Sequence, residues 1–126
     1  TEFCVFHPRL DRRGYFALNL ACDVFLDTPL WSGNNTAHEA IACGLPVVTW
    51  PGPMLRGRHA MAILARIGCA ETIAADFDDY VRIAVRAARD ASWRSHLRAE
   101  IERRRALLYD DPAPVRALAG FFLGRG

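Results

Sequence analysis

Residues 23–52 read DVFLDTPLWSGNNTAHEAIACGLPVVTWPG, and this stretch decides the fold. Its compact apolar runs at 23–27 and 46–50 have the form of strands that are buried on both faces of a parallel sheet. The segment 35–43 between them predicts a short helix, which Gly44 ends in the left-handed cap position. A strand, a helix and a second strand in this order predict a right-handed crossover in an α/β sheet.

The rest of the chain continues the alternation of strands and helices. We expect further strands at 2–7 and 70–74 and helices at 11–21, 56–67 and 112–123. From 77 on the pattern is helical and has two apolar stripes. The first stripe comprises Phe77, Tyr80, Val81, Ala84 and Ala88, and the second comprises Trp93, Leu97, Ile101 and Leu108. The predicted class is α/β, a Rossmann-like parallel sheet with helices on both faces. We expect one domain, 1–126, with an α/β part at 1–75 and C-terminal helices at 76–126. Since a complete sheet of this kind has about five or six strands, we expect its first strands to be lacking.

Composition limits the class of protein. The chain has 126 residues, 52% of them hydrophobic, which is enough to bury one core. Its 16 basic and 14 acidic residues leave a charge of +2, which argues against a nucleic-acid partner. No apolar run is long enough to cross a bilayer and no signal pattern opens the chain, so we expect a cytoplasmic protein without a membrane partner. The arginine run 103–105 follows acids on a helix and predicts a solvated face.

The loop after the first buried strand is the candidate binding site. In open α/β sheets, ligands bind at the carboxyl ends of the strands, where this loop lies. Gly33 permits a tight backbone path, and Asn34, Asn35 and Thr36 place amide and hydroxyl groups at a helix start, whose free N–H groups favour an anion. Glu39, one turn later, can accept hydrogen bonds from a ribose diol. The pattern is typical of a diphosphate site that needs no metal.

A local structural role explains part of the same pattern. Thr36 and Glu39 have the spacing of a capping box, in which the two side chains only satisfy backbone donors at the helix start. On the residues alone, both interpretations stay open.

The same stretch resembles the C-terminal catalytic lobe of the O-linked N-acetylglucosamine transferase family, with its bacterial SPINDLY-like and HMW1C-like relatives. The resemblance runs from 11 to 68 and rests on the LDTP turn, the Gly-x-x-Thr segment and the acid three residues after Thr36. It implies a GT-B fold, in which this lobe holds the UDP-sugar donor. It also implies inverting, metal-independent transfer of N-acetylglucosamine or a hexose to side chains of an acceptor protein, with no further cofactor.

The resemblance also suggests roles for single residues. Asn34, Asn35 and Thr36 fall where the family contacts the diphosphate, and Glu39 falls where the family has an acid on the ribose. The family often has His-Thr-Thr and Asp there, so this chain keeps the polar character and lacks the imidazole. Amide groups can still donate hydrogen bonds to phosphate oxygens.

Two upstream residues and one missing residue type complete the comparison with the family. Arg12 and Tyr15 lie near positions that the family uses around the uracil and the phosphates, although a surface position also explains Arg12. The family has a lysine that neutralises the leaving diphosphate, whereas this chain contains no lysine. We therefore expect the chain alone to bind weakly and not to catalyse, and the sequence identifies no catalytic residue.

Alternatives from other classes stay open. A UDP-sugar epimerase lobe of the same fold and a non-catalytic nucleotide-sugar-binding module would both use such a loop. We expect no metal site, because His38-Glu39 lacks the second histidine of a zinc-protease helix and Asp76 and Asp78 open a helix that capping explains. An incomplete sheet would leave an exposed edge, which predicts a homo-oligomer.

Overall fold

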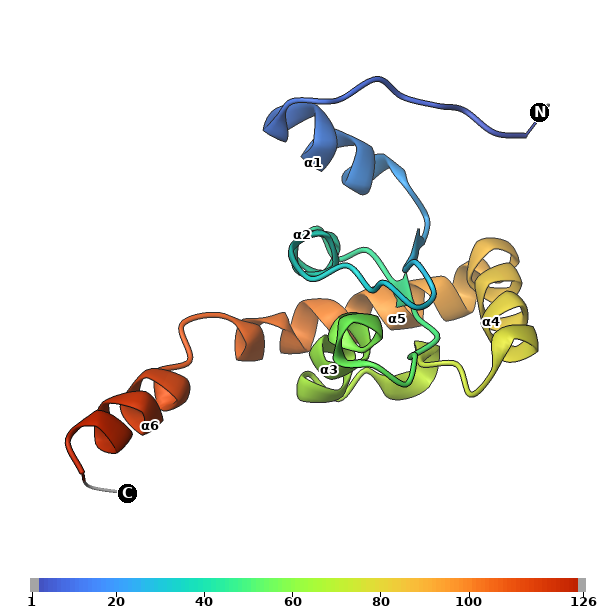
Figure 1. Cartoon of the computed structure of the whole chain (residues 1–126). Coiled ribbons are helices and arrows are strands. Elements are labelled where there is room, and N and C mark those ends of the chain that lie inside the picture. The colour runs from blue at the N-terminus through green and yellow to red at the C-terminus, as the bar shows by residue number, and fades with distance from the viewer. Residues whose placement is uncertain (1–2, 125–126) are drawn as a thin grey trace.

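The computed structural model describes residues 3–124 as a helix-rich α/β arrangement (Figure 1). The α-helices are α1 (Arg12–Ala21), α2 (Asn35–Ala42), α3 (His59–Arg66), α4 (Phe77–Arg89), α5 (Ala91–Arg104) and α6 (Ala113–Phe122). The strands are β1 (Phe25–Leu26) and β2 (Val47–Val48), and the 3-10 helices are η1 (Leu55–Gly57), η2 (Ala70–Thr72) and η3 (Arg105–Leu108). The α/β class predicted from the sequence is confirmed.

The sheet is small and parallel. Phe25 of β1 pairs with Val47 of β2, and Leu26 pairs with Val48. On the other side of β2, a single parallel bridge joins Thr49 to Ile73. The carboxyl ends of β1 and β2 therefore lie at one edge, and the loops that leave them are neighbours.

Helices cover both faces of β2. Val47 packs in a buried cluster with residues of α2, α3 and Ile101 of α5. Val48 packs in a second cluster with Tyr80 and other residues of α4 and α5. Because successive strand residues point to opposite faces, the two valines place one core on each side of the strand.

The helix ends follow signals that the sequence carries. Asp11 and Asp76 are the N-caps of α1 and α4, and each side chain accepts a hydrogen bond from the backbone N–H three residues later. Gly44 and Gly68 follow α2 and α3 with a φ of 67° each, a left-handed conformation that glycine adopts without strain. These stops turn the chain back toward the sheet after each helix.

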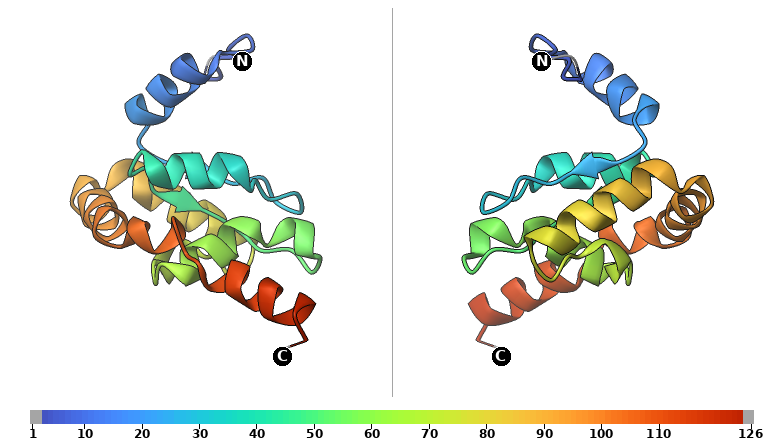
Figure 2. Two further views of the ribbon diagram at one scale, coloured as in Figure 1. Left: turned by 90° about the vertical axis from the view of Figure 1, so that its left-hand side faces the viewer. Right: turned by 90° about the vertical axis from the view of Figure 1, so that its right-hand side faces the viewer.

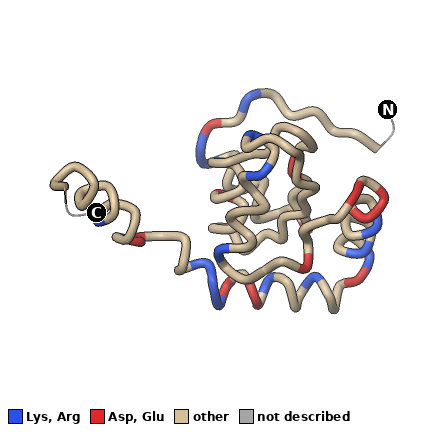
Figure 3. Tube along the Cα trace, turned by 60° about the horizontal axis from the view of Figure 1, so that its bottom comes forward, with Lys and Arg blue, Asp and Glu red and all other residues tan. Residues whose placement is uncertain are grey.

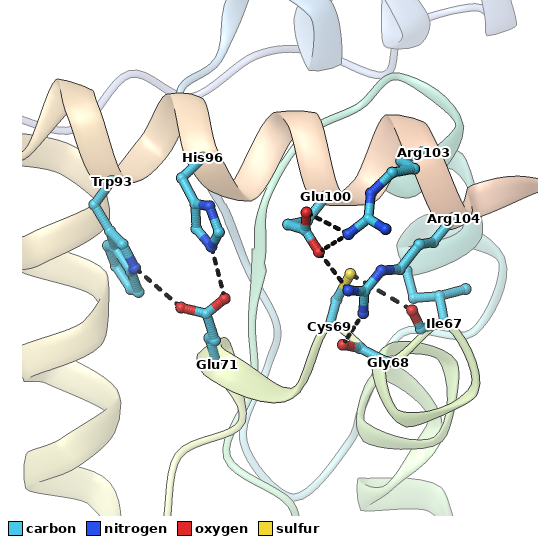
Figure 4. A network of polar contacts seen from close by, with 9 residues as sticks. All are labelled: Ile67, Gly68, Cys69, Glu71, Trp93, His96, Glu100, Arg103 and Arg104. Atoms are coloured by element: carbon cyan, nitrogen blue, oxygen red, sulfur yellow. Dashed lines mark hydrogen bonds and ion pairs between the residues drawn. The ribbon is translucent and has the colours of Figure 1, made fainter.

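Three arginines of α5 and η3 tie the ends of other helices together. Arg98 donates to the carbonyl of Cys22 after α1 (2.7 Å), Arg104 to Gly68 after α3 (2.6 Å, Figure 4), and Arg105 to Ala42 at the end of α2. A cation at a helix C-terminus satisfies free carbonyls and opposes the helix dipole. The prediction of a solvated face at 103–105 is therefore wrong for Arg104 and Arg105.

A second polar contact joins η2 to α5 (Figure 4). Oε1 of Glu71 lies 2.9 Å from Nε2 of His96, and Oε2 of Glu71 accepts a longer hydrogen bond, 3.4 Å, from Nε1 of Trp93. The carboxylate thus connects the turn after α3 to two successive turns of α5.

Charge and exposure differ between the parts of the fold. Charged residues gather at the start of α1 and along α4 and α5 (Figure 3), whereas β1 and β2 carry none and α2 carries only Glu39. α1 and α6 project from opposite ends of the body formed by the other elements (Figure 2), and no residue of α6 is buried. Within residues 3–124, no helix has both the length and the apolar character that a membrane crossing requires.

Two predicted strands do not form as expected. Residues 3–7 are exposed and unpaired, and the start of the predicted strand at 2–7 lies outside the described residues. At 70–74, η2 replaces most of the strand, and only Ile73 makes a bridge. A β-prone sequence becomes a strand only beside a partner, and no strand lies beside 3–7 in the described chain.

The buried face of α4 is turned relative to the prediction. Tyr80, Ile83 and Ala87 are buried, whereas Phe77 and Val81 of the predicted stripe are exposed. The α5 stripe is confirmed from Trp93 to Ile101.

Candidate functional site

A buried aspartate fixes the loop that leaves β1. Asp27 follows the strand and is only 2% exposed. Its Oδ1 accepts a hydrogen bond of 2.8 Å from the amide of Gly33, and its Oδ2 accepts one of 2.7 Å from Oγ1 of Thr49. One carboxylate therefore closes the loop onto itself and attaches it to the end of β2.

Gly33 makes a close approach to Thr36 at the start of α2. A Cβ atom at this position would lie 2.2 Å from Oγ1 of Thr36. A larger residue at position 33 would therefore require the Thr36 hydroxyl to rotate away from its present place.

The start of α2 is open. Asn34, Asn35 and Thr36 are all exposed, and in the described part of the chain no side chain caps this helix. The capping box does not form, because Asn34 is the N-cap residue and Thr36 already lies inside the helix. The first N–H groups of an uncapped helix have no acceptor within it, so they stay available to an anion.

Glu39 and His38 lie in the second turn of α2 and are both half-buried. Glu39 follows Asn35 by four residues, so the two share one face of the helix. His38 lies on the neighbouring face, where its Nδ1 is 3.0 Å from the carbonyl oxygen of Asn34. The hydroxyl of Tyr109 donates to the carbonyl of His38 over 3.1 Å, and burial raises the pKa of Tyr109, which keeps it protonated.

The loop after β2 packs beside this site. The amide of Ser32 donates to the carbonyl of Arg56 over 2.8 Å, and Oγ of Ser32 accepts from the amide of Ala60 over 2.9 Å. The guanidinium carbon of Arg56 lies 5.7 Å from the ring centroid of Trp31, which is 70% exposed. The starts of α2 and α3 are thus joined at one edge of the sheet.

The charges around this edge favour an anion. Between residues 28 and 60, Glu39 is the only acid, against the two arginines Arg56 and Arg58, and the nearby carboxylate of Asp27 is buried and hydrogen-bonded to Gly33 and Thr49. The start of α2 adds partial positive charge, which favours a negative ligand.

A cavity of about 520 Å³ borders the open start of α2. It lies between α2, α3 and the segment after α5, and its lining comprises Asn34, His38, His59, Ala62, Ile63, Arg66, Leu107, Leu108, Asp110, Asp111 and Pro114. Arg66 is paired with Asp111 across 2.7 Å, so this part of the rim is electrically neutral. The other polar residues of the lining are Asn34, His38, His59 and Asp110.

Arg12 and Tyr15 lie on α1, apart from the loop. The Arg12 guanidinium is 5.7 Å from the ring of Phe16 on the same helix, and within residues 3–124 neither Arg12 nor Tyr15 donates a hydrogen bond to the loop. Trp50 packs against Phe77 at 5.8 Å beside the second core cluster, so it contributes mainly to packing.

No metal-binding cluster is present among the described residues. No group of three or more histidine, cysteine or acidic side chains is close enough to hold an ion there. The cysteines of that part of the chain are free thiols.

The sequence interpretation missed three residues that hold the site. Ser32 and Thr49 anchor the loop, and the hydroxyl of Tyr80 on α4 donates to the carbonyl of Asp27 over 2.9 Å. A hydroxyl inside the apolar run PVVTW was a usable signal, because a buried Thr49 must find a partner. The spacing of α4 gave no comparable signal for Tyr80.

Comparison with known proteins identifies the family of this chain. Residues 9–110 match Glycosyl transferase family 41. A UDP-N-acetylglucosamine–peptide N-acetylglucosaminyltransferase from Caenorhabditis elegans is 39% identical over 90 residues, 71% of this chain and 7% of that protein. A probable enzyme of the same name, SPINDLY, from Eustoma exaltatum is 34% identical over 76 residues, 60% of this chain and 8% of that protein.

A solved structure shares the fold. A mutant of the O-GlcNAc transferase from Thermobaculum terrenum superposes with a TM-score of 0.74 at 32% identity, over 81% of this chain and 20% of that one. The chain thus spans less than a tenth of the curated relatives and a fifth of the solved neighbour. The family match covers most of the sequence, including the whole loop and α2, and this chain therefore belongs to glycosyl transferase family 41.

Proposed function

We propose that the chain forms the UDP-sugar-binding part of an inverting, metal-independent glycosyltransferase that transfers a sugar to protein side chains. One observation carries the proposal: a loop held by Asp27 presents Asn34, Asn35 and Thr36 at the uncapped start of α2, with Glu39 one turn later. The names of the family and of the relatives support the reaction class.

Each residue has a role that its position permits. The amides of Asn34 and Asn35, the hydroxyl of Thr36 and the free N–H groups of α2 donate to the diphosphate. Glu39 shares a helix face with Asn35 and accepts hydrogen bonds from the ribose. Arg56 and Arg58, in the neighbouring loop, add positive charge at the same edge.

The chemistry needs stabilisation of the leaving group. In an inverting transfer, an acceptor hydroxyl attacks the anomeric carbon from the face opposite the diphosphate, a new C–O bond forms, UDP departs with the electrons of the broken bond, and the hydroxyl proton passes to the departing diphosphate or to water. Donors placed along the diphosphate stabilise the charge that grows on it in the transition state. Asn34, Asn35 and Thr36 are the groups of this chain that would act at that step.

A nucleotide titration tests the proposal. The chain of residues 1–126 is titrated with UDP to millimolar concentration while its backbone amide signals are followed by NMR. We expect saturable changes at Gly33, Asn34, Asn35 and Thr36, smaller changes with UMP because it lacks the second phosphate, and no changes there with uridine.

Glu39 is tested with a matched pair of variants. Glu39→Gln should weaken UDP binding about three- to tenfold, the effect of losing one hydrogen bond to a charged acceptor. Glu102→Gln, an exposed acid on α5, should bind UDP as the wild type does. A flat UDP titration at Gly33–Thr36 in the wild type would refute the proposed site.

A further inference from the structure

A tyrosine from a distant helix contacts the start of the loop. Tyr80 lies in the first turn of α4, and its hydroxyl donates a hydrogen bond of 2.9 Å to the carbonyl oxygen of Asp27. Its side chain is only 9% exposed, and its ring stacks on Phe77 with a centroid distance of 6.4 Å. The contact joins two segments that are 53 residues apart in the sequence.

Every polar group of Asp27 is engaged. Its amide donates to the carbonyl of Val48 over 2.9 Å, its two carboxylate oxygens accept from Gly33 and Thr49, and its carbonyl accepts from Tyr80. Three elements therefore restrain this residue: β2, α4 and the far end of its own loop. Because both backbone polar groups and the side chain of Asp27 are restrained, the carboxylate that accepts from Gly33 is held in a fixed place.

We propose that Tyr80 is a positioning residue for the diphosphate loop: its phenol fixes the peptide of Asp27, and through it Gly33 and the start of α2. The inference rests on the proposed function, because it assigns to the loop the binding of a diphosphate. In this role Tyr80 contacts no ligand and acts only through Asp27.

The hydroxyl, rather than the ring, carries this role. The ring packs in the second core cluster with Val48 and Ile83, and a phenylalanine would keep that packing. Burial, with the nearby charge of Asp27, raises the pKa of Tyr80, so the phenol stays protonated and remains a donor. Tyr80→Phe therefore removes one hydrogen bond and leaves the packing of the helix.

The experiment measures loop order and UDP affinity separately. In Tyr80→Phe, hydrogen exchange of the Gly33 amide should accelerate at least about tenfold relative to the amide of Cys69, which bonds to Leu64 in the other core cluster. The dissociation constant for UDP should rise about three- to tenfold. Tyr109→Phe is the matched control, since that phenol also donates to a carbonyl, on His38, but does not touch Asp27.

The outcomes separate the two proposals. Unchanged exchange at Gly33, or equal acceleration at Gly33 and Cys69, overturns the positioning role, because only general destabilisation would then be seen. Faster exchange at Gly33 but not at Cys69 upholds the restraint of the loop by Tyr80. If the wild-type chain also binds no UDP, that second result overturns the proposed function alone. If Tyr80→Phe does not fold, Thr49→Val is used instead, because it removes another restraint on Asp27 at similar volume. Its effect is measured as the exchange rate of the Gly33 amide relative to that of the Cys69 amide.

Discussion

Oγ of Ser32 accepts a hydrogen bond of 2.9 Å from the amide of Ala60, so a residue of the first loop satisfies a donor in the first turn of α3. Both residues are buried. Ser32→Ala would leave the Ala60 N–H without this partner, and we expect it to lower the free energy of unfolding by about 1–3 kcal/mol. Urea unfolding followed by circular dichroism measures the change.

Ser95→Ala is the control for that substitution. Ser95 lies exposed on α5, so the same loss of a hydroxyl should alter stability by less than about 0.5 kcal/mol. Equal stability of Ser32→Ala and Ser95→Ala would show that the link between the two loops contributes nothing.

Gly33→Ala tests the close approach at the start of α2. The new Cβ would collide with Oγ1 of Thr36, which must rotate away from its present place. We expect UDP affinity to fall about three- to tenfold with little change in the unfolding temperature, because Thr36 is exposed. Calorimetric titration measures the affinity. At Gly52, an added Cβ meets Leu30 at an ordinary 3.5 Å, so Gly52→Ala should bind normally.

Glu71 gives a pH dependence with a defined sign. The hydrogen bond from His96, aided by the one from Trp93, holds the pKa of Glu71 below its ordinary value of 4.5. A carboxyl whose pKa is lower in the folded state adds stability above its unfolded pKa and loses it as the pH falls through the folded pKa. Near pH 6, the wild type should therefore have a higher thermal unfolding midpoint than Glu71→Gln. The difference should vanish in stronger acid.

The donor of that hydrogen bond can be tested directly. His96→Leu removes the first cause of the lowered pKa, because leucine has no hydrogen-bond donor, so the carboxyl of Glu71 should titrate closer to 4.5 when followed by carbon NMR. A titration curve that is identical in wild type and His96→Leu would contradict this assignment.

The free edge of β1 predicts self-association. Leu26 is 52% exposed, and among the described residues no strand pairs with the outer edge of β1. Exposed apolar edges invite pairing with another chain. We expect a dimer or larger assembly whose mass rises with concentration in light scattering, and we expect Leu26→Lys to reduce it. A wild-type monomer at high concentration would refute the prediction.

Local signals in the sequence located the elements around the site. Gly44 marked a helix end and Asp76 marked a helix start, and both act as expected because capping depends on neighbouring residues alone. The loop from Asp27 and the start of α2 were placed for the same reason.

Long-range contacts were beyond the reach of the sequence. The bond from Tyr80 to Asp27 depends on how α4 packs against the sheet, and spacing within α4 predicted a face shifted by one position. At 70–74, where a strand was expected, the chain forms η2 and the Glu71 carboxylate bonds to α5, a contact that spacing along the sequence does not reveal. Roles of single residues toward a ligand remain predictions.

The ties from Arg98, Arg104 and Arg105 set a lower limit on any shortened version of this protein. Each guanidinium fastens the rear of a different helix, so a truncation before Arg98 would release α1, α2 and α3 together. The loops after β1 and β2 would then lose the support of these helices, although no residue of either loop had been removed. A shortened version of this chain should therefore keep the polypeptide through Arg105.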